Sequence, residues 1–159
     1  MAKLNMEQAL AVNELQQLIN DWAYELDVNQ GLEIANLLTE DCIYSVRGAP
    51  VKGSAAVVQF YKGRLETLSA QVTGVPTQRH TISNLRVGFR SADAVSITFS
   101  LLFFTTAGSE KGLNQTDPAA VADVRMDCQR GSDGEWRIAR FDSNQAFRRE
   151  PYVKKPDDR

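Results

Sequence analysis

The chain contains a single histidine, His80, and histidine is the side chain best suited to moving protons near neutral pH. It lies near the start of a segment, residues 78–87, whose alternating pattern predicts a β-strand. Alternation places His80, Ile82 and Asn84 on one face of this strand. A lone histidine is more often structural than catalytic. Composition alone therefore favours a structural His80 and leaves a proton-transfer role open.

Asp27 ends the first predicted helix, where its negative charge opposes the helix dipole. A residue that breaks such a local rule without visible gain is a reasonable place to look for function. Two plainer alternatives are a solvated helix end and a cap for the helix that follows Gly31. Because Asp27 lies one residue beyond Leu26, the last apolar residue of the helix, its side chain could also face inward.

Three helices are predicted in the first half of the chain. The first spans residues 6–27, and its apolar stripe is Leu15, Leu18, Ile19, Trp22 and Leu26. A break at residues 29–31 precedes a short second helix whose apolar residues are Leu32, Ile34, Leu37 and Leu38. Residues 42–46 predict a strand and residues 47–50 a turn. The third helix starts at the N-cap Ser54 and continues to Leu68.

Long β-segments follow at about residues 78–89, 94–105, 121–131 and 136–147, and Asp133-Gly134 is a strong hairpin signal. Residues 107–120 form the one long loop, which is typical of a lid or an interface. Helices segregated from an antiparallel meander predict an α+β fold. We expect a cone-shaped, curved antiparallel sheet packed on about three helices and enclosing a pocket. The expected organisation is one domain, residues 1–150, and an extended or frayed tail, residues 151–159.

Composition and charge argue against several kinds of partner. The 159 residues carry a formal net charge of −2 with scattered Lys and Arg, which does not suit nucleic acid. No apolar run approaches the roughly 20 residues that span a membrane, and the N-terminus has no apolar signal region. Cys42 and Cys128 lack metal or redox spacing, so we expect buried, reduced thiols in a cytoplasmic protein. With one histidine, a zinc site is not expected.

Four segments together resemble the SnoaL-like group of the nuclear transport factor 2-like superfamily: residues 22–27 (WAYELD), 37–41 (LLTED), 79–87 (RHTISNLRV) and 133–138 (DGEWRI). The resemblance covers nearly the whole chain and implies the cystatin-like cone. Within this superfamily the functional resemblance is to scytalone dehydratase, hexachlorocyclohexane dehydrochlorinase and bile-acid dehydratase. These enzymes have an Asp–His pair, and the matching positions in this chain are Asp27 and His80. This implies an elimination in which His80 removes a proton and Asp27 orients and stabilises the imidazole. It also implies that no metal or organic cofactor takes part.

Two substrate-binding residues follow from the same resemblance. Tyr44 lies where scytalone dehydratase has a tyrosine that holds a water against the substrate carbonyl. Trp22 replaces a tyrosine of the bile-acid enzyme, so that polar role would be weakened or lost. The resemblance is incomplete, because scytalone dehydratase has a second active-site histidine and this chain has none. Residues 44–47 also lack the aspartate base of ketosteroid isomerase, which argues against that isomerisation and leaves SnoaL-type cyclisation open.

Two arginines are candidates for a cationic group in the pocket. Arg125 falls where scytalone dehydratase has a substrate-binding asparagine, but alternation groups it with Asp123 and Asp127 on a face that is equally typical of a surface. Arg140 is the competing candidate, because alternation places it with the apolar residues Trp136 and Ile138.

The favoured hypothesis is a cofactor-independent lyase or dehydratase, or an isomerase, acting on a small hydrophobic cyclic or aromatic compound. Its apolar wall would include Trp22, Phe60, Phe99 and Phe103. The alternative is a non-catalytic protein, either a ligand-binding cone or an assembly subunit like the β subunits of ring-hydroxylating dioxygenases. Both hypotheses predict a homo-oligomer, a dimer or a trimer.

Overall fold

The computed structural model describes residues 3–46, 48–71, 75–106 and 117–149. This part contains two α-helices, α1 (Met6–Val28) and α2 (Ser54–Gln71), and a 3₁₀ turn, η1 (Ile34–Leu37). Its strands are β1 (Leu38–Val46), β2 (Pro50–Lys52), β3 (Thr77–Phe89), β4 (Ala94–Thr106), β5 (Ala120–Arg130) and β6 (Trp136–Arg148). None of the helices described here is long and apolar enough to cross a membrane. The tail and most of the predicted loop, residues 107–116, lie outside the described residues.

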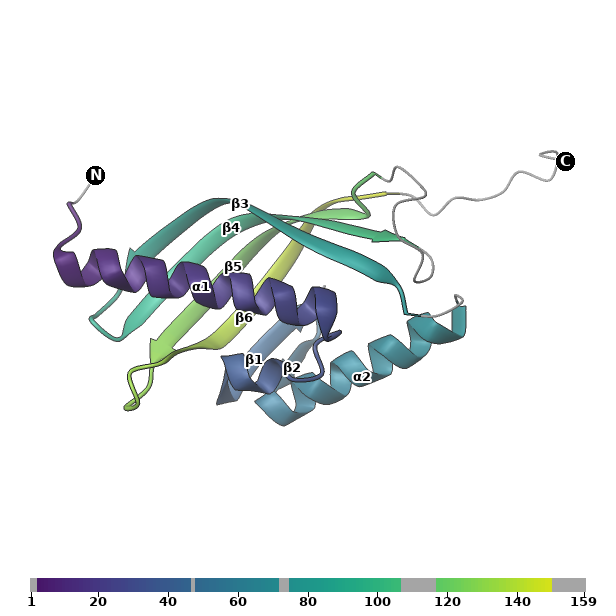
Figure 1. Ribbon diagram of the computed structural model, residues 1–159, viewed down its shortest axis with the longest axis horizontal. Coiled ribbons are helices and arrows are strands. Elements are labelled where there is room, and N and C mark those ends of the chain that lie inside the picture. The colour runs from purple at the N-terminus through teal and green to yellow at the C-terminus, as the bar shows by residue number, and fades with distance from the viewer. Residues whose placement is uncertain (1–2, 47, 72–74, 107–116, 150–159) are drawn as a thin grey trace, which may run out of the picture.

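The six strands form one sheet in the order β2-β1-β6-β5-β4-β3. Neighbouring strands are antiparallel, except that β1 runs parallel to β6. The long strands β3 to β6 curve over α1, and α2 lies at the other end of the sheet, beside β1 and β2 (Figure 1). The predicted α+β class and curved, mostly antiparallel sheet are therefore confirmed. The parallel pair was not predicted, because nothing near residues 38–46 in the sequence indicates a partner almost 100 residues away.

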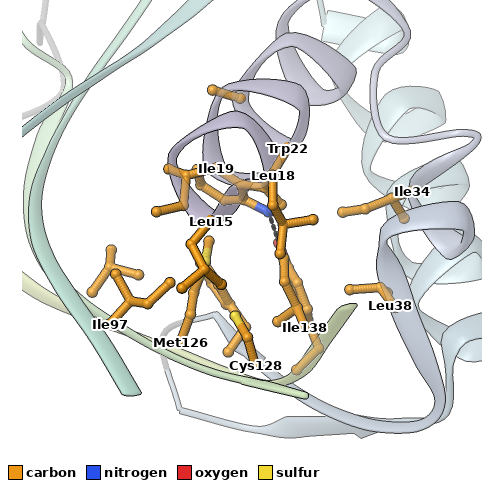
Figure 2. Packing of buried hydrophobic residues seen from close by; sticks show 14 of the residues in the cluster. Leu15, Leu18, Ile19, Trp22, Ile34, Leu38, Ile97, Met126, Cys128 and Ile138 are labelled. Carbon is orange, nitrogen blue, oxygen red and sulfur yellow. Dashed lines mark hydrogen bonds between the residues drawn. The ribbon is translucent and has the colours of Figure 1, made fainter. Parts of the chain in front are cut away.

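The core lies between α1 and the sheet. A capping box begins α1. The side chain of Asn5 accepts a hydrogen bond from the backbone N–H of Gln8 at 2.8 Å, and the side chain of Gln8 accepts one from the backbone N–H of Asn5 at 3.0 Å. Its predicted stripe is buried, and Figure 2 shows Leu15, Ile19 and Trp22 pointing toward side chains from the sheet, among them Ile97, Met126, Cys128 and Ile138. Burial of this apolar surface is the main force that holds the helix against the strands. Cys42 and Cys128 are buried free thiols, as predicted.

The predicted short second helix is the 3₁₀ turn η1 rather than an α-helix. Its four apolar residues do not form one stripe, since Leu32 is exposed while Leu38 already belongs to β1 and pairs with Ile138 of β6. The first strand therefore begins four residues before the predicted start at Cys42. The helix α2 begins at Ser54, so the predicted N-cap is the first helical residue.

A β-bulge in β3 changes which residues face the core. The pairing with β4 shifts between Ser83 and Arg86, and Asn84 adopts a left-handed φ of +57°. Such an extra residue interrupts the alternation of a strand. His80 and Ile82 are partly buried, whereas Asn84 is exposed. The prediction that Asn84 shares their face is therefore wrong.

A second bulge lies in β6. Arg140 pairs with Asp127 of β5, but the next pair joins Ile138 to Cys128, so that Ala139 is an extra residue. Trp136 and Ile138 remain buried, while Arg140 turns out to solvent. The predicted common face of Arg140 with these two residues is therefore wrong, for the same physical reason as in β3.

The turn after α1 brings the helix end against α2. Gln30 and Gly31 have φ values of +60° and +79°, and the N–H of Gly31 donates to the carbonyl of Glu25 at 3.1 Å. The ring of Tyr61 on α2 packs directly on the glycine, where an added Cβ would lie 2.6 Å from its Cγ atom. Glycine is required here both for its conformation and for its lack of a side chain.

We expect Gly31→Ala to lower the free energy of unfolding by about 2–4 kcal/mol, because it combines left-handed strain with overpacking against Tyr61. Gly63→Ala is the matched control, since Gly63 lies within α2 and an added Cβ meets nothing within 4 Å. That variant should be neutral or up to about 1 kcal/mol more stable. Urea denaturation measures both changes, and equal stability of the two variants would contradict the predicted contact.

Candidate active site

Asp27 and His80 are in direct contact, although 53 residues separate them in the sequence. Nδ1 of His80 lies 2.6 Å from one carboxylate oxygen of Asp27, and the backbone N–H of His80 donates to the other at 3.0 Å. The two side chains are 10% and 11% exposed. One carboxylate thus fixes both the strand and the imidazole ring. The geometry requires Nδ1 to carry the proton when Asp27 is ionised, which leaves the lone pair of a neutral ring on Nε2.

The C-terminal end of α1 is held by a neighbouring buried carboxylate. Glu25 accepts hydrogen bonds at 2.7 Å from the side-chain amide of Asn29 and from the backbone N–H of Glu33. These bonds satisfy the charge of Glu25 locally and tie the turn to the helix. Glu25 therefore serves the structure around Asp27 and does not contact His80.

Gln78 joins the same helix end to β3, two residues before His80. Its side chain is 1% exposed, and its amide donates to the backbone carbonyl of Leu26 and, at 3.1 Å, to the side-chain oxygen of Gln30. Its own oxygen accepts a hydrogen bond from Arg64 of α2 at 3.1 Å. Buried amides are stabilising only when they are satisfied in this way. Gln78 thus fixes the position of β3 relative to the residue that precedes Asp27.

Two aromatic rings enclose the imidazole. The ring centre of His80 lies 5.6 Å from that of Trp22, in an edge arrangement, and 4.8 Å from that of Phe103, its cross-strand neighbour on β4. These contacts restrict the ring to one orientation and keep water from most of it. Trp22 and Phe103 thus form apolar surface beside the candidate base.

Trp22 also begins a buried chain of polar contacts. Its indole N–H donates to the hydroxyl of Tyr44 at 3.0 Å, and this hydroxyl lies 2.9 Å from that of Tyr61. The ring of Phe141 stacks on Tyr44 at 4.3 Å. Burial, reinforced by the charge and hydrogen bond of Tyr61, raises the pKa of Tyr44 well above its usual value. Both predicted residues, Trp22 and Tyr44, therefore lie inside the fold, and Tyr44 is a neutral phenol at physiological pH.

The two predicted arginines lie on the outer face of the sheet. Arg125 is exposed and contacts Asp127 at 3.2 Å. Arg140 is exposed and contacts Asp142 at 2.5 Å. His80 faces the opposite side of the sheet, toward α1. The structure therefore does not bring either guanidinium together with Asp27 and His80.

Arg64, Tyr61 and Gln78 were not among the residues singled out in the sequence. Arg64 lies above the ring of Phe103, with its guanidinium carbon 5.8 Å from the ring centre. A signal was present on α2, because Val57, Tyr61 and Arg64 recur at helical spacing, which puts a charged residue on the inward stripe. Gln78 was detectable as a polar residue on the inward face of β3. Neither pattern identifies a partner by itself.

The two best-formed hollows of the described part of the chain are not lined by His80. One, of about 340 Å³, is lined by residues of β3 to β6, including Arg86, Asp123, Arg125 and Asn144. The other, of about 230 Å³, lies beside Tyr24 and Glu33. The predicted enclosed pocket at His80 stays a prediction. Within the described ranges, no three His, Cys, Asp or Glu side chains are grouped so that they could hold a metal.

Several solved structures share this fold. A protein from Catenulispora acidiphila, in complex with S-DNPA, has a TM-score of 0.72 and 23% identity, over 87% of this chain and 95% of that one. A protein from Novosphingobium aromaticivorans, provisionally assigned as a scytalone dehydratase, has a TM-score of 0.72 and 19% identity, over 93% and 92%. The LinA-type3 hexachlorocyclohexane dehydrochlorinase of Novosphingobium barchaimii has a TM-score of 0.70 and 20% identity, over 91% and 92%.

The comparison with curated protein sequences gives no significant match. At the level of families, by contrast, the model described as the SnoaL-like domain matches residues 7–142, from the first turn of α1 to the middle of β6. This span includes Asp27, His80, the strands β1 to β5 and the first half of β6. It confirms the resemblance that the sequence motifs indicated. The chain therefore belongs to the SnoaL-like domain family.

Proposed function

We propose that this protein is a cofactor-independent lyase of the dehydratase type that transfers a proton through His80 and Asp27. The observation that carries the proposal is the 2.6 Å contact between Nδ1 of His80 and Asp27, with both side chains about one-tenth exposed. A carboxylate in this position fixes the tautomer whose Nε2 is basic and stabilises the imidazolium that forms when Nε2 takes a proton. The protein's relationship to dehydratases and dehydrochlorinases of the same fold supports this chemistry.

The proposed reaction is an elimination. Nε2 of His80 takes a proton from a carbon next to a carbonyl, and the electron pair of the broken C–H bond moves into an enolate. The enolate then forms a carbon–carbon double bond as the C–O bond to a β-hydroxyl breaks, and the leaving oxygen receives the proton from His80. One water leaves, the dyad returns to its starting state, and no oxidant or reductant is required.

The side chains near the dyad suit a small, hydrophobic, cyclic or aromatic substrate. Trp22 and Phe103 supply flat apolar surface at the imidazole. The hydroxyls of Tyr44 and Tyr61 carry two protons and use one in the bond between them, so the pair can donate the other to a substrate oxygen. The S-DNPA complex of the Catenulispora protein is consistent with small-molecule binding in this fold.

The tautomer of His80 is the first test. We expect ¹⁵N NMR, recorded at a pH where the imidazole of His80 is neutral, to report a proton on Nδ1 and none on Nε2, because Asp27 accepts from Nδ1. The spectrum is unambiguous, since the chain has one histidine. Asp27→Ala should abolish the preference, whereas Asp21→Ala, an exposed site on the same helix, should keep it. A proton on Nε2 in the unaltered protein would exclude that nitrogen as the base.

Activity is the second test, measured as water loss from a panel of cyclic and aromatic β-hydroxy-ketones. His80→Ala should lower kcat/KM about 10²–10⁴-fold, because the general base is removed. Asp27→Asn should lower it about 100-fold or more, because the imidazolium loses its compensating charge. Thr81→Ala, on the exposed side of β3, is the control and should retain activity.

The panel also separates the proposal from its alternatives. A compound that binds tightly but is never converted would favour a ligand-binding cone. Turnover that survives His80→Ala would eliminate the base role. The expected dimer or trimer stays a prediction that sedimentation of the purified protein can measure.

A further inference from the structure

We infer that Gln78 and Gln30 are positioning residues for the proposed proton transfer. Together they set the direction in which the side chain of Asp27 leaves α1, and so they hold its carboxylate on His80. Neither glutamine takes part in a chemical step. The consequence for catalysis rests on the proposed function, whereas the effect on the geometry of the dyad can be measured on the protein without any substrate.

Two neighbouring contacts join the end of α1 to β3. Gln78 and His80 are alternate residues of β3, so their side chains share the face of the strand that is turned toward the helix. The amide of Gln78 donates to the backbone carbonyl of Leu26, and Nδ1 of His80 lies 2.6 Å from the carboxylate of Asp27. Consecutive residues of the helix are thus matched with alternate residues of the strand, and a displacement of the first contact moves the second.

The bond from Gln78 acts on the peptide group that directly precedes Asp27. The carbonyl of Leu26 and the N–H of Asp27 belong to one planar unit, so a partner that holds this carbonyl fixes the plane of the whole unit. Only the φ angle of Asp27 lies between that plane and the Cα–Cβ bond that carries the carboxylate. Because Asp27 is the penultimate residue of α1, this angle is helical. Gln78 therefore acts on the direction of the carboxylate through a single bond rotation.

The side chain of Gln78 has one orientation available. Its amide nitrogen carries two N–H donors and has two acceptors, the carbonyl of Leu26 and, at 3.1 Å, the side-chain oxygen of Gln30. The residue is 1% exposed, so water cannot replace a lost partner. An orientation that leaves a buried donor unpaired is strongly disfavoured. The amide consequently holds the helix end in one place.

Gln30 is in a strained conformation that its side chain helps to stabilise. Its φ angle is +60°, a region that is unfavourable for most residues other than glycine, and it is 8% exposed. Residues held in such conformations occur often at functional sites, where the surrounding structure compensates the strain. Here the compensation includes the hydrogen bond from Gln78. A glycine would suit this backbone better, but it would leave the amide of Gln78 without its second acceptor.

The first test is Gln78→Met, which keeps the length of the side chain and removes its hydrogen bonds. The backbone N–H of His80 should exchange with solvent about 10- to 100-fold faster, because it donates to Asp27 at 3.0 Å. ¹⁵N NMR of the neutral ring should show a mixture of the two tautomers in place of a proton on Nδ1 alone. For any compound that is converted, kcat should fall about 10- to 100-fold with little change in KM, because the dyad is displaced while the aromatic surfaces remain.

The second test, Gln30→Gly, separates positioning from general stability. The midpoint of urea denaturation should change little, because relief of the left-handed strain opposes the loss of the side-chain contact. Exchange of the His80 N–H should nevertheless be about 3- to 10-fold faster than in the unaltered protein, since the amide of Gln78 has lost one acceptor and keeps only the carbonyl of Leu26. If Gln30 served only overall stability, exchange and midpoint would change together.

Val95→Ala is the matched control. Val95 is 1% exposed and pairs with Phe89 at the far end of β3 from His80. The smaller side chain leaves a gap in the core and should lower the urea midpoint. The tautomer of His80, the local exchange of its backbone N–H and kcat should remain as in the unaltered protein.

The outcomes distinguish this inference from the proposed function. An unchanged tautomer and unchanged exchange in both glutamine variants would overturn the positioning role, even if elimination depends on His80. An effect of Val95→Ala as large as that of Gln78→Met would reduce the result to general stability and would also overturn it. Conversely, if the glutamine variants alter the dyad as expected but the unaltered protein converts no hydroxy-ketone, the positioning role stands and the lyase is refuted.

Discussion

The contact between the C-terminal end of α1 and the start of β3 determines the rest of the site. A carboxylate at a helix C-terminus is unfavourable by itself, and Asp27 is stabilised there because it accepts both the backbone and the ring N–H of His80. The Gln78 bond to the carbonyl of Leu26 fixes the same two elements one residue away. Trp22, five residues before Asp27 on α1, lies beside the imidazole, with 5.6 Å between the two ring centres.

The position of α1 also links the dyad to the interior hydroxyls. Trp22 contacts His80 with its ring and Tyr44 with its N–H, so a single side chain separates the proposed base from the tyrosine pair. Its burial leaves it no freedom to move independently of the core. The apolar core and the polar contacts of Trp22 with Tyr44 therefore share one side chain. A change that shifts α1 would displace His80 and the tyrosine hydroxyls together.

The elements were predictable because they depend on local patterns, whereas the pairing of Asp27 with His80, 53 residues apart, was implied only by the family resemblance. The stripe of α1, the Asp-Gly hairpin and the misplaced charge of Asp27 are all visible within a few residues. The faces of Asn84 and Arg140 were not, because one inserted residue in a strand reverses every side chain beyond it. Arg64 and Gln78 illustrate a second limit, since their importance comes from contacts between α2, α1 and β3 that no local pattern specifies. The parallel pairing of β1 with β6 is unpredictable for the same reason.

A single histidine constrains the stereochemistry of the proposed reaction. Two residues could accept the proton on one face of a substrate and donate to the leaving group on the other. In the proposed reaction one nitrogen, Nε2 of His80, does both, because Nδ1 is engaged by Asp27 and the chain has no second histidine. The carbon-bound proton and the leaving hydroxyl must then lie on the same face of the substrate ring, within reach of one imidazole. The proposed mechanism is thus a syn elimination, in which the aromatic surfaces of Trp22 and Phe103 would hold the ring while one proton passes from carbon to oxygen.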